Sequence, residues 1–473
     1  MTDPSVALRE TLLAAGNAPI VLDLHGNSRS GPELVYDVDR LAGALAEACR
    51  PRPRIGLWYR NSISAIEAFL AVEWLGGTRI PVDPGASAVE ALGVFDAAGV
   101  DVVLTDLEHS DKAGARCLVH DDRRPLAGRP CAVIEEFLAE AAFMVYPRSV
   151  TGGRLFGVPM SYRNWHATMH TNVALYRSGR YGRWDERSEV FLTAQQIMHG
   201  TGFLGTFPFL AMGLPQVVVD GFEARAAVDA IERHRATATM FVPVMLTSVI
   251  EALGQRPDAG RSLRHVLYGG GPVTGAQIQS AVRRVGPVLT QVYGRVEGGW
   301  PISILDAADH AAATGARPEL AQSCGRPIAE VKVRLRPIPG QAAGVGELLV
   351  KCDMTSSDYV DSDGWCSLGD VMRRDQDGYL FYEKRLDRMI NTGYHVYPDE
   401  IEGAIAQMAG VGRVLVRGEP HPKWGQTVVA YVVALAGTEP AALVDEIRSG
   451  LAGRLARYKI PREFRVVKEL PPE

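Results

Sequence analysis

The spacing of apolar positions divides the first third of the chain into short strands that alternate with longer helices. Apolar runs predict strands at Arg54 to Tyr59, Thr78 to Val82 and Asp101 to Leu104. The segment from Ser62 to Leu75 has the period of an amphipathic helix, and Ser87 to Ala98 reads as a second helix. Strands and helices that alternate at this spacing predict a parallel sheet covered by helices.

A second run of the same kind begins near Ala142 and ends near Glu297. It opens with a predicted strand over residues 142–147, a loop over residues 149–157 and a helix over residues 160–176. Further strands and helices then alternate up to Glu297. We expect a second α/β unit.

The pattern changes after Glu297, where strands become short and are bounded by proline and glycine. This texture predicts a small β subdomain or barrel. A tight turn at Leu368-Gly369-Asp370 is predicted to lead into a hairpin whose tip is Asp377-Gly378. From Leu386 onward helices and strands are mixed, which predicts a small α+β unit.

Together these patterns predict an α/β protein with a large N-terminal domain and a small C-terminal domain. The large domain covers residues 1–385 and holds two α/β subdomains, about 1–141 and 142–297, and a small β-barrel subdomain, 298–385. The small α+β domain covers residues 386–473. A chain of 473 residues is too long for a single core, which agrees with this division.

Composition and charge narrow the class of protein. The net charge of -5 at pH 7 gives no basic footprint, so we expect no nucleic-acid partner. The six cysteines have no metal-ligand spacing and read as reduced thiols of a cytoplasmic protein. The N-terminus lacks the pattern of a signal peptide, and no apolar run reaches the length of a membrane span. We expect a soluble enzyme and leave its oligomeric state open, a dimer included.

Four glycine-rich turns carry the candidate chemistry, and the first follows the strand at residues 142–147. It reads Ser149-Val150-Thr151-Gly152-Gly153-Arg154. Its hydroxyls and backbone N–H groups can bind phosphate oxygens. A surface loop of similar composition is the alternative, since no lysine follows in the manner of a Walker loop.

The second turn, Tyr268-Gly269-Gly270-Gly271-Pro272, lies at the carboxyl end of a predicted strand. Three glycines remove side chains, so a flat ligand can lie against the backbone. Open α/β sheets bind their ligands at this edge. A simple tight turn is the alternative reading.

The third and fourth turns each present a carboxylate. Glu297, in Tyr-Gly-Arg-Val-Glu, can coordinate Mg²⁺ on a nucleotide phosphate because a hard cation prefers oxygen ligands. The alternative is an acid that simply meets water at a strand end. Asp370, which follows Gly369, can accept hydrogen bonds from two ribose hydroxyls. His199 interrupts an apolar stretch and is either a satisfied core residue or a group that meets a substrate carboxylate.

In their order along nearly the whole chain, these turns resemble the motifs of the adenylate-forming superfamily. This superfamily holds acyl-CoA synthetases, adenylation domains of peptide synthetases and luciferases. The glycine turn at residues 269–272 is similar to Gly-Gly-Ala-Pro, residues 293–297 to Tyr-Gly-x-Thr-Glu, and residues 368–370 to the ribose turn Thr-Gly-Asp. Residues 385–387 resemble the Gly-Arg-x-Asp hinge, residues 393–402 resemble the small-domain signature, and residues 421–426 and 458–462 also fit.

The resemblance implies that the small domain is a lid and that the reaction has two halves. A carboxylate attacks the α-phosphate of ATP and gives an acyl-adenylate and pyrophosphate. The lid then rotates about the hinge, and a thiol or an amine displaces AMP. ATP and Mg²⁺ are the implied cofactors, and the partner is a small carboxylic acid, aromatic or short. CoA and an acyl carrier protein are both open as acceptors.

The resemblance also implies roles for individual residues. Glu297 would hold Mg²⁺ and would form the catalytic set with Arg385 and His199. The nucleotide would be bound by Ser149, Thr151, Gly152, Gly153, Gly269, Gly270, Gly271, Tyr293, Gly294, Asp370 and Arg385. The acyl substrate would contact His199, Gly200, Gly269 and Val292, and Asp387 would act as the hinge.

Several positions depart from the family's pattern. In the phosphate loop the usual lysine falls on Phe156, and Arg148 is a partial replacement for the lost charge. Val296 stands in place of the threonine whose hydroxyl bonds the α-phosphate. The chain ends at Glu473, ahead of the place where the family carries its catalytic lysine. We expect either a lid that is cut short or a protein that works without that lysine.

Three functions therefore stay open at this point. The first is ATP-dependent activation of a carboxylic acid, with transfer to CoA, a carrier thiol or an amine. The second is use of ATP on a non-carboxylate partner, such as nitrite in diazotisation, which the altered phosphate loop motivates. The third is a degenerate member that forms no adenylate and acts as a binding or partner protein.

Overall fold

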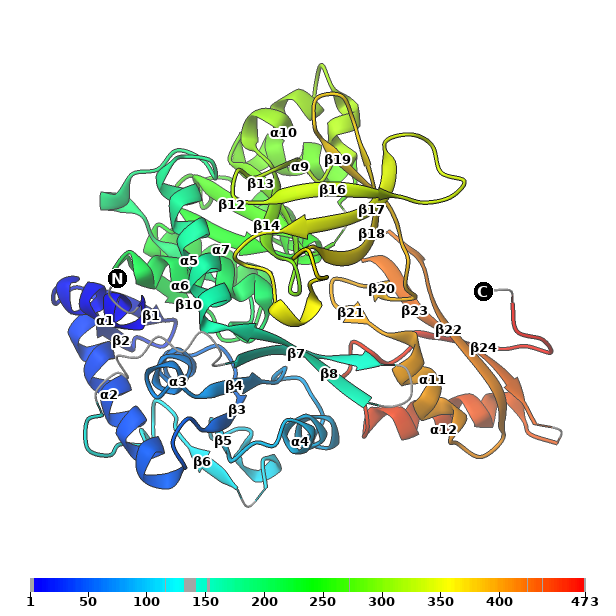
Figure 1. Cartoon of the computed structure of the whole chain (residues 1–473), viewed down its shortest axis with the longest axis horizontal. Helices are drawn as coiled ribbons and strands as arrows, with labels where there is room; N and C mark the ends of the chain where they lie inside the picture. The colour runs from blue at the N-terminus through cyan, green and yellow to red at the C-terminus, as the bar shows by residue number, and fades with distance from the viewer. Residues whose placement is uncertain are drawn as a thin grey trace.

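The computed structural model describes residues 4–471, except for residues 115, 132–141, 151–153, 272, 423 and 436. Figure 1 shows a large body that holds the N-terminus and a narrower body, on the right, that holds the last strands and helices. The predicted fold class, mixed α/β with a large N-terminal and a smaller C-terminal part, is confirmed. Within the described ranges, no helix is long and apolar enough to cross a membrane.

A nine-stranded sheet forms one half of the large body. In spatial order its strands are β15 (Arg326–Pro327), β14 (Gly299–Leu305), β13 (Leu289–Arg295), β12 (His265–Gly269), β11 (Ala238–Phe241), β9 (Phe191–Thr193), β10 (Gln216–Val218), β1 (Pro19–Asp23) and β2 (Ser28–Ser30). The run from β13 to β1 is parallel, and β14, β15 and β2 are antiparallel to their neighbours. The parallel sheet predicted from the alternating pattern is therefore present.

A six-stranded sheet forms the other half of the large body. In spatial order it holds β6 (Cys117–Val119), β5 (Val102–Thr105), β3 (Arg54–Trp58), β4 (Thr78–Pro81), β7 (Ala142–Val150) and β8 (Arg154–Ser161). Its strands are parallel except for β8, which runs antiparallel to β7. The loop predicted over residues 149–157 is wrong, because most of that segment belongs to the β7–β8 hairpin. Glycine and serine in the sequence concealed the strand pattern there.

Membership of the two sheets does not follow the predicted division of the chain near residues 141 and 297. The first strand pairs with a strand of the second run, Val21 opposite Gln216, while β7 returns to the first sheet, Phe143 opposite Arg79. At the other limit, β14 continues the nine-stranded sheet past residue 297. Parallel pairing joins strands that are remote in sequence, so a strand's own pattern does not identify its partner.

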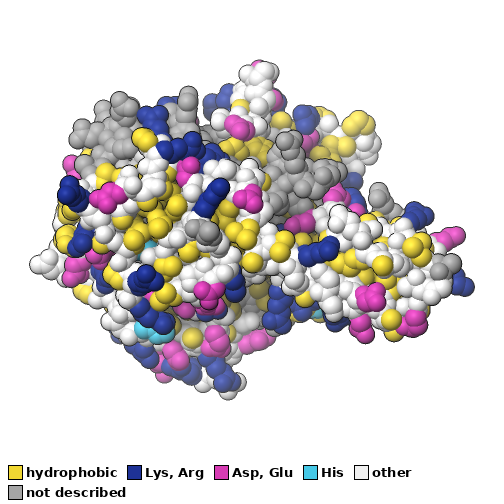
Figure 2. All heavy atoms as spheres, turned by 90° about the horizontal axis from the view of Figure 1, so that it is seen from below, with side chains coloured by type: hydrophobic (Ala, Val, Ile, Leu, Met, Phe, Trp, Pro, Cys, Tyr) yellow, Lys and Arg dark blue, Asp and Glu magenta, His cyan; other side chains and the backbone are white. Residues whose placement is uncertain are grey.

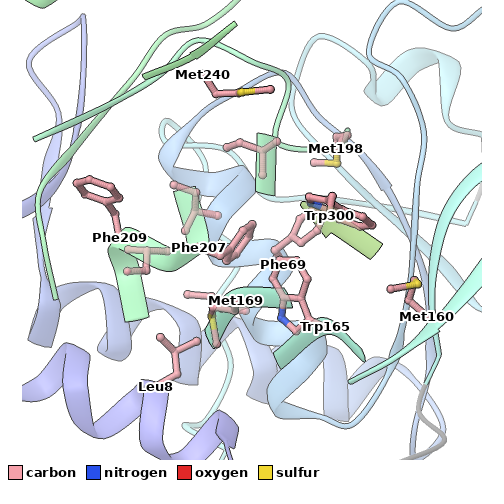
Figure 3. Packing of buried hydrophobic residues seen from close by; sticks show 14 of the residues in the cluster. Leu8, Phe69, Met160, Trp165, Met169, Met198, Phe207, Phe209, Met240 and Trp300 are labelled. Carbon is pink, nitrogen blue, oxygen red and sulfur yellow. The ribbon is translucent and has the colours of Figure 1, made fainter. Parts of the chain in front are cut away.

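One hydrophobic core lies between the two sheets. It combines residues of both sheets with α1 (Pro4–Ala14), α2 (Gly31–Ala48), α3 (Ile63–Trp74), α5 (Tyr162–Arg177) and α6 (Gly200–Ala211). Figure 3 shows Phe69, Trp165, Phe207 and Trp300 of this core close together. The two α/β units are therefore joined by shared packing and act as one body.

Helix α3 lies at the centre of this core, and every one of its residues is buried. The amphipathic helix predicted for this segment is wrong for that reason. Its two acids are paired inside the protein: Glu67 Oε2 lies 2.8 Å from His120 Nε2, and Glu73 Oε2 lies 3.2 Å from Arg79 Nη1. Buried carboxylates are tolerated only with such partners.

The outer faces of the two sheets carry the remaining helices of the large body. α7 (Ala224–His234), α8 (Pro243–Gln255) and α9 (Gly275–Val285) pack on the nine-stranded sheet and form a second core with it. α4 (Ala88–Ala97) packs on the six-stranded sheet. α10 (Ala307–Ala313) follows β14. The resulting order of layers is helix, sheet, helix, sheet, helix.

The predicted β subdomain is an open four-stranded antiparallel sheet, so the expectation of a closed barrel is wrong. Its strands are, in spatial order, β16 (Lys332–Pro337), β17 (Val345–Lys351), β18 (Cys366–Arg374) and β19 (Leu380–Arg385). Leu368-Gly369-Asp370 lies within β18 and is not the turn that was predicted. Gly369 has φ +70° there, and the register shifts between Val371 and Met372, which is the geometry of a β-bulge.

The small C-terminal body has its own core. It consists of the two-stranded ribbon β20 (Ile390–Asn391) and β21 (His395–Val396), helices α11 (Pro398–Ala406) and α12 (Pro440–Ala452), and the sheet of β22 (Val411–His421), β23 (Gly425–Ala434) and β24 (Glu463–Val466). In the view of Figure 2, acidic and basic side chains are interspersed over both bodies, and neither sign forms a stripe.

Candidate active site

A cavity of about 530 Å³ lies where the carboxyl ends of the parallel strands meet the small C-terminal body. Three parts of the chain line it. The nine-stranded sheet contributes Val242, Gly270 and residues 292–297, the loop after β4 and helix α4 contribute Val82, Asp83 and Glu90, and the small body contributes Gly393, Tyr394, Tyr397, Glu400, Tyr458 and Lys459. This volume and this position are typical of a small-molecule site in an α/β protein.

Two glycine positions bring the backbone of β12 close to its neighbours. A side chain at Gly269 would place its Cβ 2.2 Å from the Val292 carbonyl oxygen, so only glycine fits beside β13. Gly270 has φ +82° and lines the cavity. Asn391 Nδ2 of the small body donates to the Gly270 carbonyl at 3.1 Å. The predicted glycine turn is thus a tight turn at the cavity wall, and the small body closes onto it.

The carboxylate of Asp370 is buried at the edge of the cavity and holds two partners. Arg385 Nη1 donates to its Oδ1 at 2.6 Å, and Tyr293 Oη donates to its Oδ2 at 2.5 Å. Asp387 holds the same guanidinium from the other side. Burial raises the pKa of Asp370, and the charges of Arg295 and Arg385 offset only part of that rise. The structure therefore joins the predicted ribose acid, hinge arginine and hinge acid into one cluster.

The carboxylate of Glu297 lies on the same side of the cavity. Arg295 Nε donates to its Oε1 at 2.9 Å, and both side chains are buried. The backbone carbonyl of Glu297 accepts from Ser356 N at 3.0 Å, which ties the end of this segment to the neighbouring sheet. The acid is therefore positioned rigidly, and a buried cation lies against it.

His199 lies at the opposite wall, one residue before helix α6 begins. Its Nε2 is 2.6 Å from Asp83 Oδ2, and its ring packs edge-on against Tyr394, with 5.6 Å between centroids. Burial would raise the pKa of Asp83, but its hydrogen bond and charge interaction with His199 lower that pKa overall. The sequence left His199 open between core and pocket, and the structure places it in the cavity wall.

The small body is held against the large one by a buried lysine. Lys459 Nζ lies 3.0 Å from Glu400 Oε1 on α11 and also bonds to Glu90 on α4. Burial alone would lower the pKa of Lys459, but the two carboxylates raise it overall. The neighbouring Tyr458 stacks on Tyr394, with 4.5 Å between ring centroids. These contacts close the cavity on the side of the small body.

The predicted site residues fall into three groups. Those that line the cavity are His199, Gly200, Gly270, Val292, Tyr293, Gly294 and Glu297. Those that lie next to it are Gly269, Gly271, Asp370, Arg385 and Asp387. The third group belongs to the phosphate loop: Thr151, Gly152 and Gly153 lie outside the described residues, as does the side chain of Ser149.

Sequence reasoning missed four residues of this site: Asp83, Glu90, Arg295 and Lys459. A signal existed for three of them. Asp83 follows a predicted strand directly, Arg295 lies inside the Tyr-Gly-Arg-Val-Glu segment, and Lys459 lies inside residues 458–462, which fit a family motif. Glu90 had none, because only folding brings helix α4 and the C-terminal segment together.

Two family profiles match this chain. The profile described as AMP-binding enzyme matches residues 8–360, and the profile described as AMP-binding enzyme C-terminal domain matches residues 400–472. The medium/long-chain-fatty-acid–CoA ligase FadD8 of Mycobacterium tuberculosis is 30% identical over an alignment of 319 positions that covers 63% of this chain and 55% of that ligase. The match thus spans little more than half of that relative.

Two further proteins are similar over almost the whole chain. A feruloyl-CoA synthase of an Amycolatopsis species is 28% identical over a gapped alignment of 474 positions that covers 94% of this chain and 91% of that enzyme. The solved structure of the amide bond synthetase McbA from Marinactinospora thermotolerans has a TM-score of 0.84 and 28% identity. That likeness covers 98% of this chain and 96% of that one.

Proposed function

The chain belongs to the AMP-binding enzyme family, and we propose from this premise that it activates a carboxylic acid with ATP and transfers the acyl group to an acceptor. The observation that carries the proposal is the convergence of Asp370, Tyr293, Gly270 and Glu297 at one end of the parallel sheet. These groups match the parts of a nucleotide. The relatives described above are named for acid–CoA ligation and for amide bond synthesis, two uses of an activated acid.

The nucleotide would bind between the Gly270 turn and Asp370. The flat backbone at Gly270 and the ring of Tyr293 suit the adenine, and the buried carboxylate of Asp370 suits two ribose hydroxyls. Asp370 already accepts from Arg385 and Tyr293, yet each carboxylate oxygen has a second lone pair to offer. Arg385 then orients the acid for the ribose.

The residues present also fit a magnesium ion. Among the described residues no group of three His, Cys, Asp or Glu side chains could hold a metal. Mg²⁺ does not need such a cage, since it is usually held by one or two carboxylates together with substrate phosphates. Glu297 is a buried carboxylate in the wall of the cavity and suits that role. When bound, the metal would neutralise phosphate charge.

The acid would occupy the apolar half of the cavity. Phe222, Met240, Val242, Met245 and Trp300 line this part. Gly200 faces Trp300, and a Cβ there would lie 3.7 Å from the indole, so the glycine keeps this end open. The lining suits an apolar or aromatic acid whose carboxylate points toward His199 and the nucleotide.

The acceptor would enter beside the small body, which we propose is a lid that rotates about Asp387. A second cavity of about 730 Å³ lies between the two bodies next to the first, and Arg448, Arg457 and Arg462 line it. Three exposed guanidinium groups suit an acceptor that bears phosphates. CoA and the phosphate-linked thiol of an acyl carrier protein both meet this description. The thiol sulfur would attack the acyl carbon, and AMP would leave with the bonding electron pair.

An amine acceptor is the second candidate. It is favoured by the His199–Asp83 pair, because a histidine held by a carboxylate can take the proton of an attacking amine. The likeness to an amide bond synthetase over 98% of this chain supports the same candidate. The two acceptor classes differ in one respect: the arginine-lined cavity would bind the phosphates of a phosphorylated thiol, whereas a simple amine would make no use of it.

Pyrophosphate exchange with a panel of carboxylic acids tests the first half of the proposal. Exchange that depends on an apolar or aromatic acid and on Mg²⁺ is the expected result. Release of AMP with CoA or with an amine then identifies the acceptor. Absence of exchange over a broad panel, together with ATP use on nitrite, would favour the non-carboxylate alternative. Failure to bind Mg-ATP in titration calorimetry would favour a protein that forms no adenylate.

A further inference from the structure

Arg295 is a buried cation on the nucleotide side of the cavity, and no role assigned above uses it. Its side chain is 5% exposed, and it lines the cavity between Gly294 and Val296. The free energy of burying a guanidinium is high unless an anion faces it. Its position therefore calls for an explanation in terms of charge.

In this structure Arg295 uses only some of its hydrogen-bond donors. Nε and Nη2 both lie 2.9 Å from one oxygen, Oε1 of Glu297. The acceptor recorded for Nη1 is the thioether sulfur of Met389, 3.9 Å away, which is a weak acceptor. A guanidinium has five N–H donors, so donors remain for a further anion.

The charged residues around Arg295 indicate where that anion would lie. Arg385 is held by Asp370 and Asp387, so it is already committed to two carboxylates. Arg295 has Glu297 as its bonded partner, and it also interacts electrostatically with Asp370, the acid that suits the ribose. A phosphate attached to that ribose would lie within the field of Arg295. Val296, its neighbour, has no hydroxyl to offer such a phosphate.

Binding of a nucleotide with Mg²⁺ would change the partner of Arg295. If the carboxylate of Glu297 turns to the metal, the guanidinium loses its bonded anion while it stays buried. A buried ion that loses its partner is strongly destabilising, so a phosphate oxygen would take that place. The exchange costs no new desolvation of the arginine, because its burial is already complete in the folded protein.

We propose that Arg295 is a ligand of the nucleotide α-phosphate in this protein: it pairs with Glu297 in the free site and moves to the phosphate when Glu297 takes up the metal. This inference rests on the proposed function, since it presumes a nucleotide in the cavity. It assigns to a residue of β13 the positive charge that Phe156 of the phosphate loop does not supply.

Titration calorimetry with adenosine, AMP and ATP, each in the presence of Mg²⁺, on the full chain tests the assignment. Arg295→Gln is expected to weaken AMP binding by about 10- to 100-fold, the loss of one charge-assisted hydrogen bond, and to leave adenosine binding within about twofold. Arg334→Gln, at a half-exposed arginine of β16, is the matched control and should change neither. Equal losses for AMP and adenosine, or no loss for AMP, would overturn the proposal.

A second pair of variants guards against simple misfolding. Glu297→Gln frees the guanidinium, so AMP affinity in EDTA should rise severalfold. The double variant Arg295→Gln/Glu297→Gln, which removes both charges of the pair, should lose that gain. A Glu297→Gln protein with unchanged AMP affinity in EDTA contradicts the exchange of partners. A wild-type protein that binds neither AMP nor Mg-ATP refutes the proposed function and this inference with it, whereas normal wild-type binding with an inert Arg295 refutes the inference alone.

Discussion

Replacing Lys459 by methionine should loosen the small body from the large one. The lysine side chain is 8% exposed and lies between Glu90 and Glu400, which are 9% and 14% exposed. At the 3.0 Å separation of Nζ and Glu400 Oε1, the gross attraction is about 5 kcal/mol for an effective dielectric constant near 20. The desolvation of three ions offsets part of this attraction, so the pair itself contributes less.

The variant nevertheless loses more than the net value of the pair, because it leaves two carboxylates facing each other without a cation. Breaking a buried ion pair in this way typically costs about 3–5 kcal/mol, and we expect a loss of about 3 kcal/mol in the free energy of unfolding. Burial already raises the pKa of Glu90. In the variant the pKa of Glu90 should rise further above its value in the unfolded chain. The destabilisation should therefore grow as the pH rises through the folded-state pKa of Glu90, and it should shrink toward pH 5.

Urea denaturation at pH 5 and pH 8 measures this difference. Trypsin cleavage after Arg388, in the segment between the two bodies, reports on the docking itself. Lys332→Met, at an exposed lysine of β16, is the control and should change neither readout. A loss of stability that is the same at both pH values, or cleavage as slow as in the wild type, would refute the reasoning.

Three other changes test other parts of the molecule. Asp370→Asn should weaken adenosine binding by about 1–3 kcal/mol in calorimetry, since it removes a buried charged acceptor of the ribose hydroxyls; unchanged affinity would exclude the ribose role. His199→Gln should slow acyl transfer to an amine by about 100-fold and pyrophosphate exchange far less; equal slowing of both would contradict a base at Asp83–His199. Burial opposes the charge of Glu73, but His166 and Arg79 lower its pKa to about 2. A carboxyl group with a depressed pKa stabilises the fold above its unfolded pKa, and this stabilisation is lost as the pH falls. Between about pH 4.5 and 2 the free energy of unfolding should therefore fall by about 3 kcal/mol less in Glu73→Gln than in the wild type.

The alternation of apolar runs predicted most individual elements well, because period and length are local properties. The helix predicted at Ser87 to Ala98 is present as α4, Ala88–Ala97, and Asp377-Gly378 does form the tip of the β18–β19 hairpin. The sequence could not predict which strands pair with one another. The partner of β1 is β10, and nothing in either segment distinguishes that pairing from one with β3.

The candidate site shows the same difference between features that are local in sequence and contacts between remote parts of the chain. Residues that belong to a short motif at a strand end, such as Tyr293 and Glu297, could be found from the sequence, because strand ends of a parallel sheet meet at one edge. The ion pairs of Lys459 could not, although residues 458–462 fit a family motif, since its two carboxylate partners lie on helices far away in the chain. Asp83 was missed because its partner, His199, lies in the other sheet's half of the protein.

The pairing of β1 with β10 also has a consequence for the order in which the chain can fold. Val21 finds its neighbour, Gln216, only after the whole six-stranded sheet between them has been synthesised. Until then the β1 edge of the N-terminal hairpin is unpaired, as the outer β2 edge also is, and the hairpin has no sheet to join. During translation this edge would wait, exposed, while later residues emerge, and strand edges in that state are prone to association with other chains.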